Sequence, residues 1–173
     1  MSAKGPHMPA WYDDSITRLH EARTLLDIAH QHESDENGDR FKACISGFIA
    51  LAFSVNEYVE KRQQARVPYT ALGFASTSKE PARAAPLFAF FHEVRRVSFH
   101  RKLITPDRLN VSVFTVYEGT DERVSVVQEM RHCWLFKDTE KHGLPDQQHV
   151  LTLCSEYHGL LTELVERTAA AAH

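Results

Sequence analysis

The sequence predicts a mainly α-helical protein, a four-helix bundle with a β-hairpin inserted before the last helix. Three observations favour this fold class. Apolar residues recur at helical spacing in four separate stretches, the pattern changes to alternation between residues 109 and 136, and the length of 173 residues suits one domain. With 43% hydrophobic and 25% charged residues, the composition is that of a globular chain with a single core.

The first two predicted helices span residues 12–31 and 39–64, with a turn at Ser-Asp-Glu-Asn-Gly, residues 34–38. At the start of the first helix, Asp13, Asp14 and Ser15 are expected to accept hydrogen bonds from the free amides of the first turn. The second helix has the most continuous apolar face and is expected at the centre of the bundle. Its predicted inward residues are Phe41, Ile45, Phe48, Ile49, Ala52, Val55, Tyr58 and Val59.

The second half of the chain contains the other two helices and the hairpin. A loop is predicted over residues 67–86 and a third helix over 85–101, and the phenylalanines of that helix are interpreted as core: Phe88, Phe90, Phe91 and Phe99. Two alternating runs around Gly119, residues 109–117 and 123–136, predict a β-hairpin. Pro145 and Asp146 are expected to open the last helix, which runs to residue 167.

Residues 1–8 resemble a cloning remnant, residues 9–168 are expected to form one domain, and residues 169–173 form a tail. The hairpin, at about residues 109–136, is an insertion within that domain. No run of 18 apolar residues and no secretory signal pattern is present, and three cysteines without framework spacing suit a reducing compartment. We therefore expect a cytoplasmic protein with no membrane partner.

Charge is distributed unevenly along the chain. The formal net charge is −3, which argues against a protein coated with positive charge for non-specific binding of nucleic acid. Residues 92–108 nevertheless contain five basic and two acidic side chains, a net of +3. The sequence therefore predicts a local basic site within an acidic protein.

The usual patterns of metal and nucleophile chemistry are weak. Glu129 and His132 have Glu-x-x-His spacing but fall in a predicted strand, where the two side chains are expected on opposite faces. Cys44 and Cys154 occur near apolar helix faces, where cysteine behaves as a small hydrophobe, and Cys133 lies in a strand. No glycine-rich phosphate loop occurs. We expect no metal and no cofactor.

The remaining candidate is the end of the third helix, Phe91-His-Glu-Val-Arg-Arg-Val-Ser-Phe-His-Arg-Lys102. Here Arg95 is followed by four residues and then His100. This Arg-x4-His pattern on a late helix of a bundle resembles the signature of the HEPN superfamily. Many members of that superfamily are metal-independent ribonucleases of toxin–antitoxin, CRISPR and phage-defence systems.

The resemblance implies a site around Arg95 and His100 that engages RNA or a nucleotide. In the sharper form of this hypothesis, the site cleaves RNA and is assembled across a homodimer. His100 is implied as the acid/base and Arg95 as the phosphate clamp, with Arg96, Arg101 and Lys102 as further RNA contacts. These residue types suit the chemistry, because histidine titrates near neutral pH and arginine binds phosphate through two parallel hydrogen bonds. One departure weakens the implied catalysis. Arg96 occupies a position that is usually Asn, Asp or His, and it cannot accept a hydrogen bond from the catalytic histidine.

Two other interpretations of this segment stay open. In the first, Arg101 and Lys102 simply complement the negative end of a helix, and the basic cluster has no function. In the second, the chain is a non-catalytic helical module that binds another protein, such as an antitoxin or an immunity-type partner. The departure at Arg96 and the acidic net charge favour that second alternative.

Three smaller groups of residues are also candidates. Asn56 and Glu57 interrupt the apolar pattern of the second helix and can face the same cleft as the motif. Cations at the end of that helix can extend a basic groove, or else complement the helix dipole: Lys61, Arg62 and Arg66. Trp11 and Tyr12 either anchor a dimer partner or cap the bundle.

Overall fold

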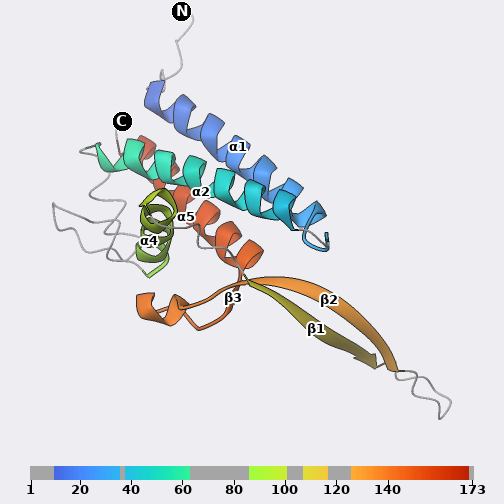
Figure 1. Cartoon of the computed structure of the whole chain (residues 1–173). Coiled ribbons are helices and arrows are strands. Elements are labelled where there is room, and N and C mark those ends of the chain that lie inside the picture. Colours follow the sequence, from blue (N-terminus) through green and yellow to red (C-terminus); the bar gives the residue numbers. More distant parts are fainter. Residues whose placement is uncertain (1–9, 36–37, 63–85, 101–106, 117–125, 172–173) are drawn as a thin grey trace, which may run out of the picture.

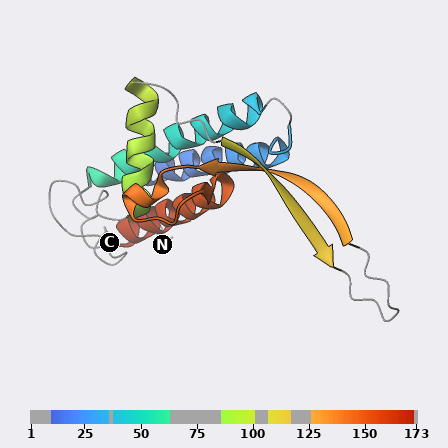
Figure 2. The same cartoon turned by 60° about the horizontal axis from the view of Figure 1, so that its bottom comes forward.

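The computed structural model describes residues 10–35, 38–62, 86–100, 107–116 and 126–171. Its four long helices are α1 (Ala10–Gln31), α2 (Asp39–Glu60), α4 (Pro86–His100) and α5 (Val150–Ala170). Helices α1, α2 and α5 lie side by side, and α4 crosses them at a steep angle (Figure 1 and Figure 2). The predicted fold class is confirmed, because the protein is a helical bundle with a β-hairpin before its last helix.

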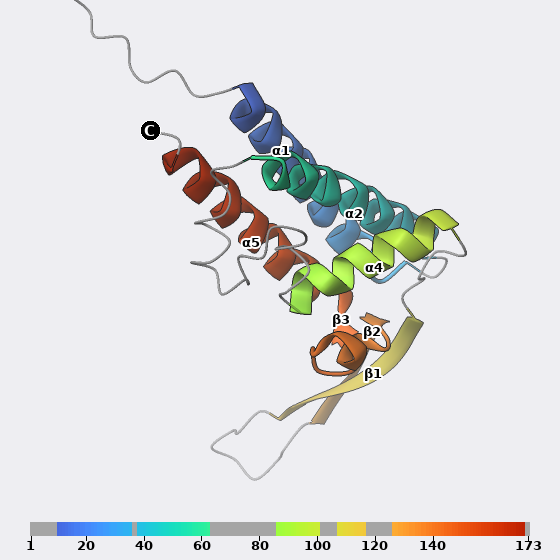
Figure 3. The same ribbon diagram turned by 90° about the vertical axis from the view of Figure 1, so that its left-hand side faces the viewer.

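The hairpin extends away from the helices (Figure 1 and Figure 3). Its strands, β1 (Asp107–Val116) and β2 (Val126–Phe136), pair antiparallel, from Asp107 opposite Leu135 to Val116 opposite Val126. A two-residue strand, β3 (Gln148–His149), pairs with the end of β2 and completes a three-stranded sheet of order β1-β2-β3. Between β2 and β3 lies a 3-10 helix, η3 (Thr139–His142). The sequence predicted neither β3 nor η3.

Aromatic side chains of α4 fasten the crossing helix to the bundle. The ring of Phe91 stacks on Tyr157 of α5 with 4.3 Å between centroids, and Phe88 meets the same tyrosine edge-on at 5.2 Å. Phe90 packs edge-on against Phe136, the last residue of β2, at 5.1 Å. Phe88, Phe90 and Phe91 are buried, so their interpretation as core is confirmed, whereas the side chain of Phe99 lies outside the described part.

Helix α2 packs against α1, α4 and α5 and buries the face that the apolar pattern indicated. Two positions differ from the prediction. Tyr58 is half-buried under the guanidinium group of Arg18, which lies 5.5 Å from its ring centroid. Asn56 is buried instead, with 5% of its surface exposed.

The base of the hairpin is fixed to the turn between α1 and α2 by Trp134. Its indole Nε1 donates a hydrogen bond to the Glu33 carbonyl at 3.0 Å, and its ring stacks on Phe41 with 5.1 Å between centroids. Gly38 leaves room for this ring. A Cβ at Gly38 would lie 2.3 Å from Cζ2 of Trp134, and the backbone φ of +63° there is one that glycine adopts without strain.

The start of the last helix is where the sequence prediction was wrong. Helix α5 begins at Val150, five residues after Pro145, because His149 caps it. His149 Nδ1 accepts the backbone N–H of Thr152 at 3.4 Å, while Nε2 lies 2.6 Å from Oε1 of Glu33. Histidine is not among the usual N-cap residues, and this one is set in place by a contact from the turn after α1.

Three other helix ends also differ from the prediction. Helix α5 runs to Ala170, and Ala169, which was predicted to lie in a tail, is buried within it. Helix α1 begins at Ala10, so Ser15 lies inside it, and its hydroxyl donates to the Trp11 carbonyl at 2.7 Å instead of capping an amide. Helix α2 ends at Glu60 rather than at residue 64, and Arg62 N–H bonds the Val59 carbonyl in a tighter final turn. Among the described helices, none is long and apolar enough to cross a membrane.

Candidate functional site

One side of α4 carries a histidine and an arginine that both lie near the same aromatic side chain of α2. Proline at the first position of α4 suits a helix start, and the helix then runs without a break to His100. His92 and Arg95 are three residues apart and therefore share a side of this helix. The Arg95 guanidinium lies 3.7 Å from the centroid of the Phe53 ring, and the His92 ring lies 5.7 Å from the same centroid.

The continuous helix separates the two residues of the Arg-x4-His pattern. Because each residue turns an α-helix by about 100°, Arg95 and His100 are about 140° apart around the axis of α4. The histidine that shares the side of Arg95 is thus His92, which the pattern did not single out. His100 is described as the last residue of α4 without its side chain, and Arg101 and Lys102 lie outside the described residues.

Arg96 is occupied by an intrahelical ion pair. Its Nε and a terminal nitrogen donate to the two carboxylate oxygens of Glu93, at 2.8 and 2.7 Å. These hydrogen bonds lower the pKa of Glu93, with smaller contributions from the charges of Arg96, His142 and His92, and Glu93 in turn raises the pKa of Arg96. Arg96 remains exposed, but Glu93 balances its charge.

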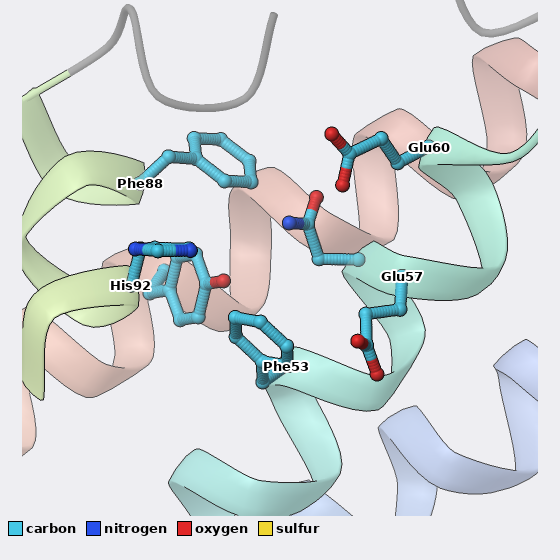
Figure 4. Close-up of a pocket in the computed structure, with 7 residues that line it drawn as sticks. Phe53, Glu57, Glu60, Phe88 and His92 are labelled. Carbon is cyan, nitrogen blue, oxygen red and sulfur yellow. The ribbon is translucent and has the colours of Figure 1, made fainter. Parts of the chain in front are cut away.

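A pocket of about 200 Å³ opens beside this face, between α2, α4 and α5 (Figure 4). In the close-up, Phe88 and His92 point into it from α4, Phe53 closes it from below, and the Glu60 carboxylate is directed toward it from the end of α2. The lining consists of Phe53, Asn56, Glu57 and Glu60 of α2, Phe88 and His92 of α4, and Tyr157 of α5.

The pocket answers one of the sequence hypotheses. Asn56 and Glu57 do face a cleft beside α4, and among the described side chains of the motif segment they share it with His92 and not with Arg95. Sequence reasoning missed His92, Glu60 and Tyr157. A signal for Glu60 was present, because it follows Asn56 by four residues and so lies on the same side of α2.

The remaining candidates from the sequence are Trp11, Tyr12 and the cations at the end of α2. Trp11 and Tyr12 are half-buried and pack against the core. The guanidinium of Arg62 lies 5.7 Å from the Trp11 ring centroid, Lys61 is exposed at the end of α2, and Arg66 lies outside the described residues. Trp11 thus packs within its own chain beside Arg62.

Two of the cysteines have the character expected of small apolar residues. Cys154 is fully buried in α5, Cys44 is half-buried on α2, and burial raises the pKa of both thiols. Cys133 lies on β2, half-buried. A raised pKa keeps a thiol protonated at neutral pH, so Cys44 and Cys154 are not activated nucleophiles.

Glu129 and His132 both lie on β2, in the strand that the sequence predicted. Within the described ranges, no group of three or more histidine, cysteine, aspartate or glutamate side chains is placed to hold a metal ion. Comparison with models of protein families, with curated proteins and with solved structures gives no match for this chain.

Proposed function

We propose that this chain is a HEPN-like RNA-binding domain that cleaves RNA without a metal ion, acts as a homodimer and belongs to a toxin or defence system in the cytoplasm. The observation that supports an RNA contact at α4 is the placement of Arg95. Its guanidinium is held over the Phe53 ring at 3.7 Å, with His92 beside it on the same ring. A positioned arginine next to an imidazole suits a phosphodiester, since the first binds phosphate oxygens and the second transfers protons.

In the proposed reaction the ribose 2′-hydroxyl attacks the adjacent phosphorus. A histidine acting as base takes the hydroxyl proton, the 2′-oxygen forms a bond to phosphorus, and the bond from phosphorus to the 5′-oxygen breaks. The leaving 5′-oxygen receives a proton from an acid, which leaves a 2′,3′-cyclic phosphate and a free 5′-hydroxyl. Arg95 stabilises the negative charge that builds on the phosphate oxygens. His100 is the proposed acid/base, and His92 is the second histidine that can transfer a proton beside Arg95.

The helix geometry of α4 supports the dimeric form of this proposal. Since Arg95 and His100 are about 140° apart around one helix, they approach a common phosphate most directly when each comes from a different copy of the chain. His92 and Arg95, in contrast, share a side within one chain. The two arrangements predict different behaviour of mixed variants.

The test is cleavage of a labelled RNA pool in excess chelator by the wild-type protein and by Arg95→Ala, His92→Gln and His100→Ala. His20→Ala is the matched control, because His20 is an exposed histidine on α1. Loss of an acid/base group, or of a donor that stabilises the developing charge, lowers the rate by about 10²-fold or more. We expect the first for His100→Ala and the second for Arg95→Ala, while the control keeps wild-type activity.

Mixing two inactive variants tests the shared site. A dimer of one Arg95→Ala chain and one His100→Ala chain contains one intact pair if the two residues act across the interface, so cleavage returns in part. If they act within one chain, the mixture stays inactive. Equal cleavage by the wild type and His100→Ala would refute the assignment of His100.

The second candidate function is a non-catalytic module that binds a protein. The pairing of Arg96 with Glu93, and the carboxylates of Glu57 and Glu60 beside His92, favour it because they leave less net positive charge for phosphate. RNA that stays intact in all samples, together with a protein that copurifies at a one-to-one ratio, would select this function over RNA cleavage.

A further inference from the structure

One edge of β2 lies open along much of the hairpin. The described sheet has the order β1-β2-β3, and β3 pairs with β2 only at Leu135 and Phe136. The residues from Val126 to His132 pair with β1 on one side. On their other side the described part of the chain has no strand, and the hairpin extends there away from the helices (Figure 1 and Figure 3).

A further strand along this edge would stabilise the hairpin. The backbone N–H and C=O groups at the edge of a sheet pair readily with a strand of another chain. A two-stranded ribbon is only marginally stable without a third strand or a helix beside it. Among the described elements, β1 packs mainly against β2, so the bundle gives the ribbon little support along its length.

The order of charges in β2 suits a second copy of the same strand. In an antiparallel pair with two-fold symmetry, one residue lies opposite itself, and the residues before and after it lie opposite each other. Met130 lies about midway between the start of β2 at Val126 and the first pair with β3 at Leu135. With Met130 on the axis, Glu129 of each copy lies opposite Arg131 of the other.

These two charges also select the register of the pairing. Glu129 and Arg131 share a face of β2, because alternate residues of a strand point to the same side. Opposite charges directly across two strands stabilise the pair, and like charges destabilise it. An axis at Glu129 would place two glutamates opposite each other, and an axis at Arg131 would place two arginines opposite each other. Only the axis at Met130 makes both contacts favourable among these three neighbouring registers.

The outer edge of β1 has no such pattern. The charged residues of β1 are Asp107 and Arg108, which are adjacent at the start of the strand. Adjacent residues fall on opposite faces, so an antiparallel pair of β1 strands does not bring these two charges directly opposite each other on one face. The edge of β2 is therefore the one whose sequence is complementary to itself.

We propose that two copies of the chain associate through β2, antiparallel about Met130, and form a continuous sheet of order β1-β2-β2-β1 across the two-fold axis. Residues 128–132 of each copy form the centre of this contact. The contact closes after two copies, because both use the same edge. It specifies the surface of the proposed homodimer and rests on that part of the proposed function, but it does not require that the chain cleaves RNA.

Sedimentation velocity of the full chain over a range of concentrations tests the contact. A short edge-to-edge contact is small, so we expect a wild-type dimer with a Kd on the order of 100 µM. Glu129→Arg and Arg131→Glu each place like charges opposite each other, and each should weaken the dimer by about tenfold or more. The double variant Glu129→Arg/Arg131→Glu exchanges the two charges and should restore the wild-type Kd.

A mixture of the two single variants tests the register directly. One variant then has only positive charge at positions 129 and 131, and the other has only negative charge there. Their heterodimer should therefore form with a Kd close to that of the wild type, although each variant alone associates poorly. The control is Glu21→Arg, which changes the net charge by as much as Glu129→Arg at an exposed position of α1 and should leave the Kd unchanged. Far-ultraviolet circular dichroism verifies that the helices are intact in every variant.

The possible failures have different meanings. A wild-type chain that stays monomeric up to about ten times the expected Kd would overturn both this surface and the proposed homodimer. A dimer that persists unchanged in both single variants would refute pairing through β2 and would leave a homodimer that forms through another surface. Equal weakening by Glu21→Arg, or a mixture that associates no better than its components, would also refute the proposed contact.

Discussion

The ion pair of Glu93 and Arg96 decides how much of the cationic character of α4 reaches a ligand. Two hydrogen bonds hold the Arg96 guanidinium on a carboxylate of its own helix. A phosphate that binds Arg96 therefore has to compete with Glu93. At the residue scale, Arg96 is therefore less available to a phosphate than its exposure alone suggests.

This pair predicts a pH dependence of stability. The folded-state pKa of Glu93 is lowered, chiefly by its hydrogen bonds from Arg96. The pair therefore stabilises the fold in full above the unfolded carboxyl value of about 4.3, and this contribution is lost as the pH falls through the lower folded-state value. Thermal melts of the wild type and Glu93→Gln should differ slightly at pH 7, with the variant less stable, and should converge in strong acid.

The matched control for this comparison is Glu140→Gln, an exposed glutamate of η3. A difference between wild type and Glu93→Gln that grows on acidification would contradict the assignment. The same variant also bears on the proposed function. Since it releases Arg96 from its partner, it should tighten RNA binding at neutral pH, whereas a protein-binding module gives no such gain.

At the scale of single elements, two glycines, one before α2 and one within α5, have opposite effects on stability. Gly38 precedes α2 with a left-handed φ of +63°, and Trp134 fills the space where a side chain would lie. Gly159 is exposed within α5, and a Cβ there would meet nothing within 4 Å. The first glycine is required by the fold, and the second only weakens a helix.

Alanine at these two positions should change the free energy of unfolding in opposite directions. Gly38→Ala forces alanine into the left-handed region and against an indole ring, and we expect a loss of about 2–4 kcal/mol. Gly159→Ala should gain about 0.5–1 kcal/mol, the usual difference between glycine and alanine inside a helix. Urea denaturation of both variants measures this, and a Gly38→Ala protein as stable as wild type would contradict the close packing of Trp134.

The N-terminal cap of α5 depends on a contact with a distant part of the chain. His149 accepts the Thr152 amide through Nδ1, which requires that this nitrogen is unprotonated and that Nε2 carries the hydrogen directed at Glu33. One side chain thus joins the turn after α1 to the start of α5. Such a contact arises from tertiary structure, and the local sequence around Pro145 contains no signal for it.

At the scale of the whole molecule, periodicity predicted the elements but not how they cross. The apolar spacing of residues 39–60 and 150–165 was enough to place α2 and α5 and most of their buried faces. The steep crossing of α4 depends on how Phe91 stacks on Tyr157, a contact between residues 66 positions apart in the sequence. No local pattern specifies that contact.

The candidate site was predicted in part for the same reason. Asn56 was recognisable because a polar residue interrupted an apolar face. His92 was not, because its importance comes from its position against Phe53 and not from its spacing along the chain. The motif at Arg95 and His100 was visible in the sequence, but helix geometry separates its two residues within one chain.

The junction of hairpin and helices rests largely on Trp134, which is 4% exposed. Trp134→Ala leaves a cavity between Phe41 and the turn after α1, and we expect a loss of about 3–5 kcal/mol of unfolding free energy. Trp134→Phe keeps a ring for the stack but loses the hydrogen bond to the Glu33 carbonyl, so its loss should be smaller, at about 1 kcal/mol. Equal losses in the two variants would contradict a junction held mainly by ring packing.

The fluorescence of the same indole can report on the junction between the hairpin and the bundle. The chain has two tryptophans, Trp11 and Trp134, so Trp11→Phe leaves a single fluorophore at the point where the hairpin joins the bundle. Its emission depends on the local polarity, on the Phe41 ring below it and on the Lys42 ammonium 5.2 Å from its ring. A red shift of that emission, recorded beside the far-ultraviolet circular dichroism of the helices, would reveal whether the hairpin detaches before the bundle melts or only together with it.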